Sequence, residues 1–246
     1  MPTWSKLLYQ HDPLAIAQGD VNYYSSVQKF GANFEISTNS DPESVWTAGG
    51  LYPWAALDAA ETLHLISTDA GDTDTVLLEG LDANYLPILE TLQMTGNTAV
   101  TTVNQFKRIY RIKYDTGAVN AGIVTARTVS GAGVVVAQID ATNAQSLMAI
   151  YTVPSGFTAY LTNLDFSVNK GKDAQCRLYV REFGRSFRIK HLTEVYENSY
   201  RYNFTIPLKF TEKTDLDIIV YQVESAATRV SCNFDLILVD NARPNH

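Results

Sequence analysis

Short apolar runs alternate with polar turn clusters along most of the chain, a pattern typical of antiparallel strands. Between residues 46 and 140 the pattern predicts about seven strands, a number and spacing typical of a β-sandwich. Two of them, 75–82 and 88–94, flank the tight reversal Asp82-Ala83-Asn84-Tyr85 and form a predicted β-hairpin. The other predicted strands of this module are 62–67, 97–103, 106–114, 123–127 and 134–139.

A small polar stretch at residues 140–144 separates this module from a second one at residues 145–240. In the last predicted strand of the second module, Cys232, Phe234 and Leu236 alternate with residues of the opposite face. About eight antiparallel strands in a module of this length are the pattern of a jelly-roll-like sandwich.

Residues 1–45 lack clear periodicity, and Pro13 and the Asp41-Pro42 step interrupt them. We predict an irregular, apolar-rich N-terminal arm here, which should lie on its own domains or on a neighbouring subunit. The predicted fold is therefore all-β: two tandem antiparallel β-sandwich modules, jelly-roll-like or immunoglobulin-like, preceded by an arm. The predicted domains are residues 1–45, 46–140 and 145–240.

Composition adds a charge asymmetry to this picture. The chain is 46% hydrophobic and 18% charged, and it shows neither a run of apolar residues that would span a membrane nor a secretory signal, so no membrane partner is expected. The net charge of −7 is unevenly spread: residues 1–106 carry two basic and thirteen acidic side chains, whereas residues 107–246 carry seventeen basic and thirteen acidic ones. Two interpretations stay open, namely ordinary surface variation, or head-to-tail packing of copies and docking on a partner of fixed sign.

No motif in the sequence indicates an enzyme, a cofactor or a metal site. The four histidines are scattered, and Cys176 and Cys232 stand in apolar strand contexts without a CxxC partner, so we expect no zinc site. The two cysteines could form one disulfide, but reduced core cysteines are the favoured interpretation. The basic residues do not form the patch with interleaved aromatics that a nucleic-acid binder shows, so no nucleic-acid partner is expected.

Two groups of acidic residues have side chains suited to chemistry. Asp69, Asp72 and Asp74 are close enough in sequence to hold Ca²⁺, but the EF-hand spacing is missing, and an acidic loop without an ion is the favoured interpretation. The nominal candidates for the paired carboxylates of a glycoside hydrolase are Glu182, Glu194 and Glu197. Surface positions explain these glutamates equally well, and we expect a non-enzymatic protein.

The most distinctive local feature is a basic run that begins at Lys170. Arg177, Arg181 and Arg185 are separated by even numbers, so on a strand they would share one face until Gly184 interrupts it. One interpretation is a solvated outer sheet face. The other is a contact surface for an acidic partner, including the acidic half of a neighbouring copy, because guanidinium groups pair bidentately with carboxylates. The candidate partner-contact residues are Lys170, Lys172, Arg177, Arg181, Arg185 and Arg188.

Five stretches of the sequence match a known pattern: 45–50 (VWTAGG), 78–85 (LEGLDANY), 97–102 (NTAVTT), 148–161 (MAIYTVPSGFTAYL) and 187–191 (FRIKH). They resemble an uncharacterised family of virion structural proteins of environmental, especially aquatic, tailed bacteriophages, and the resemblance covers most of residues 45–215. It implies a place in a virion that is assembled in the cytoplasm of the host bacterium. No single motif identifies a reaction or a ligand.

The leading functional hypothesis is a non-enzymatic virion protein that decorates or cements the capsid surface or lies at the neck. Its expected partners are further copies of itself, with a trimer as the expected state, and virion proteins such as the major capsid or neck proteins. The alternative is a tail- or fibre-associated module that binds a host-receptor glycan. That function needs an exposed aromatic cluster, for which Trp46, Tyr52 and Trp54 are the candidates, and core packing is the competing interpretation of these residues.

Overall fold

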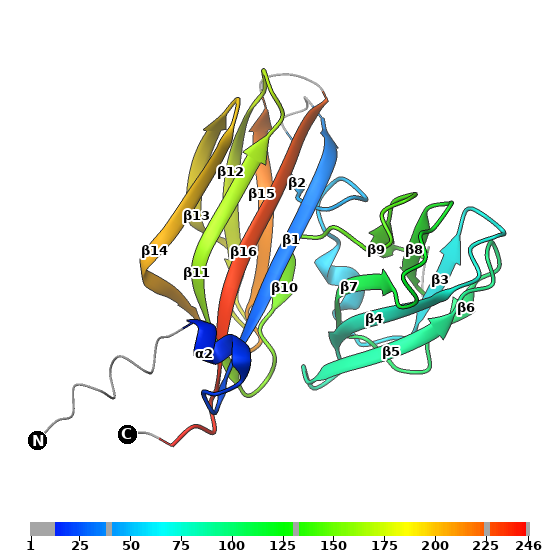
Figure 1. Ribbon diagram of the computed structural model, residues 1–246, viewed down its shortest axis with the longest axis horizontal. Coiled ribbons are helices and arrows are strands. Elements are labelled where there is room, and N and C mark those ends of the chain that lie inside the picture. Colours follow the sequence, from blue (N-terminus) through cyan, green and yellow to red (C-terminus); the bar gives the residue numbers. More distant parts are fainter. Residues whose placement is uncertain (1–12, 38–40, 130–132, 224–226, 245–246) are drawn as a thin grey trace, which may run out of the picture.

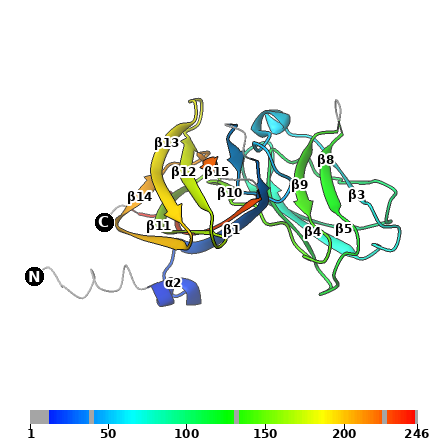
Figure 2. The ribbon, with the colours of Figure 1, turned by 90° about the horizontal axis from the view of Figure 1, so that it is seen from above.

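The computed structural model describes residues 13–37, 41–129, 133–223 and 227–244. These residues form two β-units, a larger one at the left and a smaller one at the right of Figure 1, and Figure 2 shows the same division from above. Within them, helix is confined to α2 (Pro13–Gln18) and to the 3-10 turn η1 (Trp54–Leu57). The prediction of an all-β chain with antiparallel sheets is confirmed.

The larger unit contains two sheets whose strands are β1 (Tyr24–Ile36), β2 (Glu43–Ser44), β10 (Ile150–Thr152), β11 (Phe157–Val168), β12 (Asp173–Arg181), β13 (Arg188–Tyr196), β14 (Ser199–Phe210), β15 (Asp215–Val223) and β16 (Thr228–Asp240). One sheet has the order β1-β16-β11-β14, and the other has the order β10-β15-β12-β13, with β2 also paired to β15. If β2 and β10 are counted as one strand, the larger unit has eight strands, which can be numbered from 1 to 8 in chain order. The spatial order is then 1-8-3-6 in the first sheet and 2-7-4-5 in the second. This is the strand order of a jelly roll.

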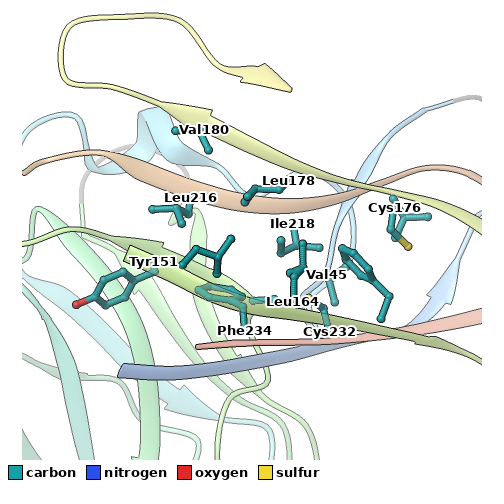
Figure 3. Close-up of a cluster of buried hydrophobic side chains, with 14 of the residues drawn as sticks. Val45, Tyr151, Leu164, Cys176, Leu178, Val180, Leu216, Ile218, Cys232 and Phe234 are labelled. Atoms are coloured by element: carbon teal, nitrogen blue, oxygen red, sulfur yellow. The ribbon is translucent and has the colours of Figure 1, made fainter. Parts of the chain in front are cut away.

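Alternation along the strands builds the core between these two sheets. Every second residue of β12, from Ala174 to Val180, is buried, and β16 follows the same rule. Figure 3 shows the result: Leu178 and Ile218 from one sheet point toward Leu164 and Phe234 from the other.

The two cysteines also lie in this core. Cys176 and Cys232 are buried and free, and burial raises the pKa of the Cys176 thiol to about 12. Neither thiol is therefore ionised at neutral pH, which makes both side chains inert core residues.

The smaller unit is built from β3 (Leu63–Ser67), β4 (Thr75–Leu81), β5 (Pro87–Gln93), β6 (Val100–Thr101), β7 (Arg108–Tyr114), β8 (Val124–Thr128) and β9 (Val135–Ile139). Its two sheets have the orders β6-β3-β8-β9 and β5-β4-β7, and they share a second hydrophobic core that includes Leu65, Leu78, Phe106 and Ile139. The predicted hairpin is confirmed, because β4 and β5 pair in register from Thr75↔Gln93 to Leu81↔Pro87.

The smaller unit is inserted into the jelly roll between β2 and β10, and the two connecting segments run side by side. The Ala149 N–H donates to the Val45 carbonyl at 2.9 Å, and Trp46 and Met148 form an antiparallel bridge. β1 crosses this point through Gly31, where an added Cβ would lie 2.2 Å from the Ala149 nitrogen and 2.5 Å from the Val45 oxygen. Only glycine allows this approach of three backbone segments.

The structure corrects the predicted layout of the chain. The strands form four separate sheets, and the larger unit is not one continuous stretch of chain, so two tandem sandwiches are not found. The prediction of an irregular arm is wrong for residues 24–36, which form the thirteen-residue strand β1 and pair with β16 from Tyr24↔Val239 onward. β1 was missed because its edge position leaves polar residues on both faces. Residues 1–12 of the predicted arm lie outside the described residues.

Candidate functional site

The structure divides the predicted basic run among a turn, a sheet face, a buried junction and a surface cleft. Lys170 and Lys172 lie in the turn between β11 and β12. Arg177 lies on the outer face of its sheet, where its guanidinium carbon is 3.8 Å from the centroid of the Tyr221 ring. The six predicted contact residues therefore do not form one surface.

Arg181 lies at the junction between the two units and binds a buried carboxylate. Its Nε and Nη2 atoms lie 2.8 and 2.6 Å from Oδ2 of Asp215. Arg108 of the smaller unit approaches the same carboxylate, with Nε 3.0 Å from Oδ1. Thr152 also donates a hydrogen bond to Oδ1, at 2.6 Å. Asp215 thus holds an arginine from each unit, and we call Arg108, Arg181, Asp215 and Thr152 the junction clamp.

A second carboxylate, Asp217, faces the same junction from the same side of β15. Its Oδ2 accepts hydrogen bonds from Trp54 Nε1 at 2.8 Å and from the Ser44 hydroxyl at 3.1 Å. Its Oδ1 is buried and has no hydrogen-bond partner among the described residues. Burial raises the pKa of Asp217 to about 7, because the hydrogen bonds do not offset the loss of hydration.

The aromatic cluster that was the candidate for a glycan platform is buried at this junction, as the competing core-packing interpretation expected. Trp46, Tyr52 and Trp54 are 3, 4 and 8% exposed. Their rings form an edge-to-face series that continues to Phe187 of the larger unit, with centroids 5.1, 4.9 and 5.6 Å apart. These residues join the two units and present no platform to a ligand.

A buried lysine makes another contact between the units. Lys29 of β1 donates a hydrogen bond to the carbonyl of Tyr110 in β7 and lies 5.5 Å from the centre of its ring. Burial and the nearby Arg111 lower the pKa of Lys29 to about 7, with Glu79 acting in the opposite direction. The junction therefore contains two ionisable side chains, Lys29 and Asp217, whose pKa values both lie near 7.

The remaining basic residues line a cleft of about 450 Å³ between the start of β13 and the end of β14. Arg185 and Arg188 from the predicted run meet Lys190 and Lys209 there, against the single carboxylate of Glu182. All five side chains are exposed. Arg185 and Arg188 were predicted contact residues, and Lys190 belongs to the same basic run. Lys209 was missed, since β14 lies far from the run in sequence.

Beside the cleft, β13 and β14 carry apolar side chains into solvent. We call these two strands, with the cleft between them, the β13–β14 edge. The exposed apolar residues are Ile189, Leu192, Tyr196, Tyr200, Tyr202 and Ile206. Further in, His191 packs against the rings of Tyr202 and Phe204, with centroids 5.0 and 5.7 Å away. Several exposed apolar side chains on two adjacent edge strands favour an interaction surface here.

The acidic loop is organised by hydrogen bonds within the chain. Asp72 is buried, and its two oxygens accept the backbone N–H groups of Ala121 and Gly122 at 2.7 and 2.9 Å. Asp69 and Asp74 point to solvent. Within the described ranges no three metal-ligating side chains converge. Asp72 thus fixes the β3–β4 loop to the segment at Ala121 and Gly122.

The three glutamates proposed for hydrolysis are not brought together. Glu182 follows the end of β12, whereas Glu194 lies opposite Gln175 near its start and Glu197 lies beyond the end of β13. At about 3.3 Å per residue, the separation of Glu182 from Glu194 is roughly 20 Å. Paired glycosidase carboxylates are within about 10 Å of each other.

No family model matches the chain, and no curated protein matches it. Among solved structures, the PBSX exported protein XepA is 7% identical, with 86% of this chain and 84% of that chain covered and a TM-score of 0.21. The VP2 subviral particle of infectious bursal disease virus is 9% identical, with 91% and 74% covered and a TM-score of 0.24. TM-scores of this size carry no argument about fold or function. In the described part of the chain, no helix has the length and apolar character to cross a membrane.

Proposed function

We propose that the chain is a non-enzymatic structural protein of a tailed-phage virion, which decorates or cements the capsid surface or lies at the neck. The observation that carries the proposal is the jelly-roll strand order of the larger unit, since jelly rolls recur in viral capsid domains. One fold serves many functions, and the sequence resemblance to phage virion proteins supports this particular use.

The junction supports a role that needs rigidity. Its buried charges bind one another, with Asp215 held between Arg108 and Arg181, and the aromatic series from Trp46 to Phe187 fixes the units further. A jelly roll with a second β-unit fixed to its side presents two surfaces at a set spacing. Such an arrangement suits a protein that bridges or decorates capsomers.

The proposed partners are further copies of the chain, with a trimer as the expected state, and neighbouring virion proteins such as the major capsid or neck proteins. Assembly takes place in the cytoplasm of the host bacterium. The arginine-rich cleft and the apolar β13–β14 edge are the exposed features that favour such contacts.

Immuno-gold labelling of purified particles of the encoding phage tests this proposal. We expect gold at regular positions on the head surface or at the neck, and mass spectrometry of the same particles should find the chain in many copies. Absence of the chain from purified particles would overturn the proposal. Labelling confined to the fibre tips would instead favour the receptor-binding alternative. The structure does not support the aromatic platform of that alternative, because Trp46, Tyr52 and Trp54 are buried at the junction.

A further inference from the structure

The β13–β14 edge is an open side of the jelly roll. β13 and β14 are the last strands of their sheets, and within the described residues each pairs with a neighbour along one side only. Exposed strand edges offer free N–H and C=O groups to another chain, and proteins normally cover or charge them. Here exposed apolar side chains stand beside the charged ones: Ile206 is 83% exposed, Tyr196 62% and Leu192 47%.

The charges near this edge have a defined sign. The cleft that opens between β13 and β14 is lined by Arg185, Arg188, Lys190 and Lys209, with only Glu182 opposed to them. None of these cations forms an ion pair in the described structure, in contrast to Arg181 at the junction. A ligand of this edge therefore combines apolar contact with negative charge.

The opposite end of the molecule has the complementary charge. The inserted unit, residues 46–148, has ten acidic and five basic side chains. Asp69 and Asp74, in the loop between β3 and β4, are exposed, and so is Asp115, whose N–H bonds to the Thr75 carbonyl at the start of β4. We call Asp69, Asp74 and Asp115 the acidic end. Figures 1 and 2 place β14 and the β3–β4 region at opposite ends of the long axis.

We propose that the β13–β14 edge binds the acidic end of a second copy of this chain, in a head-to-tail contact. The charge complementarity of two exposed surfaces within one chain identifies the occupant. A contact between two different surfaces is heterologous, so repetition closes a ring or extends a filament. This inference deepens the proposed function by naming the surfaces through which copies of the structural protein join.

Sedimentation velocity of the purified full chain at low and high salt tests the contact. We expect concentration-dependent self-association that weakens as salt rises, because exposed charges are screened. Reversal of one charge at the edge, Arg188→Glu, should raise the dissociation constant about tenfold or more. The matched control Arg229→Glu makes the same change on another exposed part of the jelly roll and should leave association unchanged.

Two further pairs of variants separate the apolar and acidic contributions. Ile206→Asp should abolish association, whereas Val103→Asp, at an equally exposed apolar position of the inserted unit (88%), should not. Asp74→Lys should weaken association like Arg188→Glu, and its control Asp20→Lys should not. Each variant is compared with the wild type by thermal unfolding, so that loss of fold is recognised.

A mixing experiment distinguishes head-to-tail from symmetric contact. The Arg188→Glu and Asp74→Lys proteins retain one intact surface each. At a concentration at which each is monomeric alone, they should form a 1:1 complex when mixed. The proposal is overturned if the wild-type protein stays monomeric at high concentration. This holds even if the edge is found to bind a glycan. Association that survives Asp74→Lys but not Ile206→Asp overturns the head-to-tail arrangement. Because this assay uses pure protein, its result is independent of the gold labelling that tests virion membership.

Discussion

Arginines and aromatic rings gather in two regions of this molecule, the junction between the units and the β13–β14 edge, and the two differ in what surrounds them. At the junction, Arg108 and Arg181 share a carboxylate that is 4% exposed. At the edge, Arg188 and Lys190 face solvent without an ion pair in the described structure. The same residue types therefore fix an internal geometry in one place and remain available for a partner in the other.

The largest expected effect comes from removing the carboxylate of the junction clamp. Asp215→Ala leaves the buried Arg108 and the partly exposed Arg181 without their counter-ion, which should lower the free energy of unfolding by about 3–5 kcal/mol. Urea unfolding followed by tryptophan fluorescence measures this change. Asp20→Ala removes an exposed carboxylate and should leave the midpoint unchanged. A loss as small as that of the control would show that the clamp does not hold the units together.

The second prediction concerns pH and Asp217. Its pKa in the folded protein, about 7, lies above the ordinary value of 3.8, so between these two pH values the folded state binds more protons than the unfolded state. Stability contributed by this group is complete at low pH and is lost as the pH rises to 7. Asp217→Asn should flatten this fall in urea midpoints measured from pH 4 to 7. An unchanged slope would contradict the burial of an ionisable Asp217.

The shifted pKa of Lys29 has the opposite effect on the pH dependence of stability, at pH values above 7. Its pKa is lowered from 10.5 to about 7 in the folded protein, so between these values the unfolded state binds more protons and stability rises with pH. Lys29→Met should remove this rise between pH 7 and 10. Lys170→Met, at an exposed lysine, serves as the control and should retain it. Equal slopes in both variants would contradict the prediction.

The smallest expected effect lies at the edge. Leu192→Ala, at a position 47% exposed, should change the free energy of unfolding of the monomer by no more than about 0.5 kcal/mol. The same substitution at Leu178, which is 1% exposed on the neighbouring strand, should cost about 2–5 kcal/mol. A large loss at Leu192 would show that the edge is part of the core and not a contact surface.

Local patterns were enough to predict most of the strands, because alternation and turn residues depend on neighbours in sequence. The β4–β5 hairpin follows from the reversal at Asp82–Tyr85, and β12 and β16 alternate as buried strands should. The insertion and the pairing of β1 with β16 could not be predicted this way. They depend on contacts between distant segments, and β1 has too few apolar residues to be recognised as a strand.

The junction clamp was missed for a related reason. Arg181 was predicted as a surface contact because its partner Asp215 is 34 residues away and Arg108 is 107 residues from that aspartate. One signal was present: Asp215 and Asp217 place two carboxylates on the same face of an otherwise apolar strand. Buried carboxylates require partners, so this strand predicts a paired arginine without identifying which one.

The position of β1 also has a consequence for how the protein is made. The jelly roll cannot close until β16 leaves the ribosome, because its first strand pairs with its last across roughly 200 residues. The inserted unit is complete once Ala149 has been synthesised, and all strand pairings of its two sheets lie within its own stretch of chain. It is therefore expected to fold first, during translation, and to hold β1 at Gly31 until the end of synthesis supplies its partner.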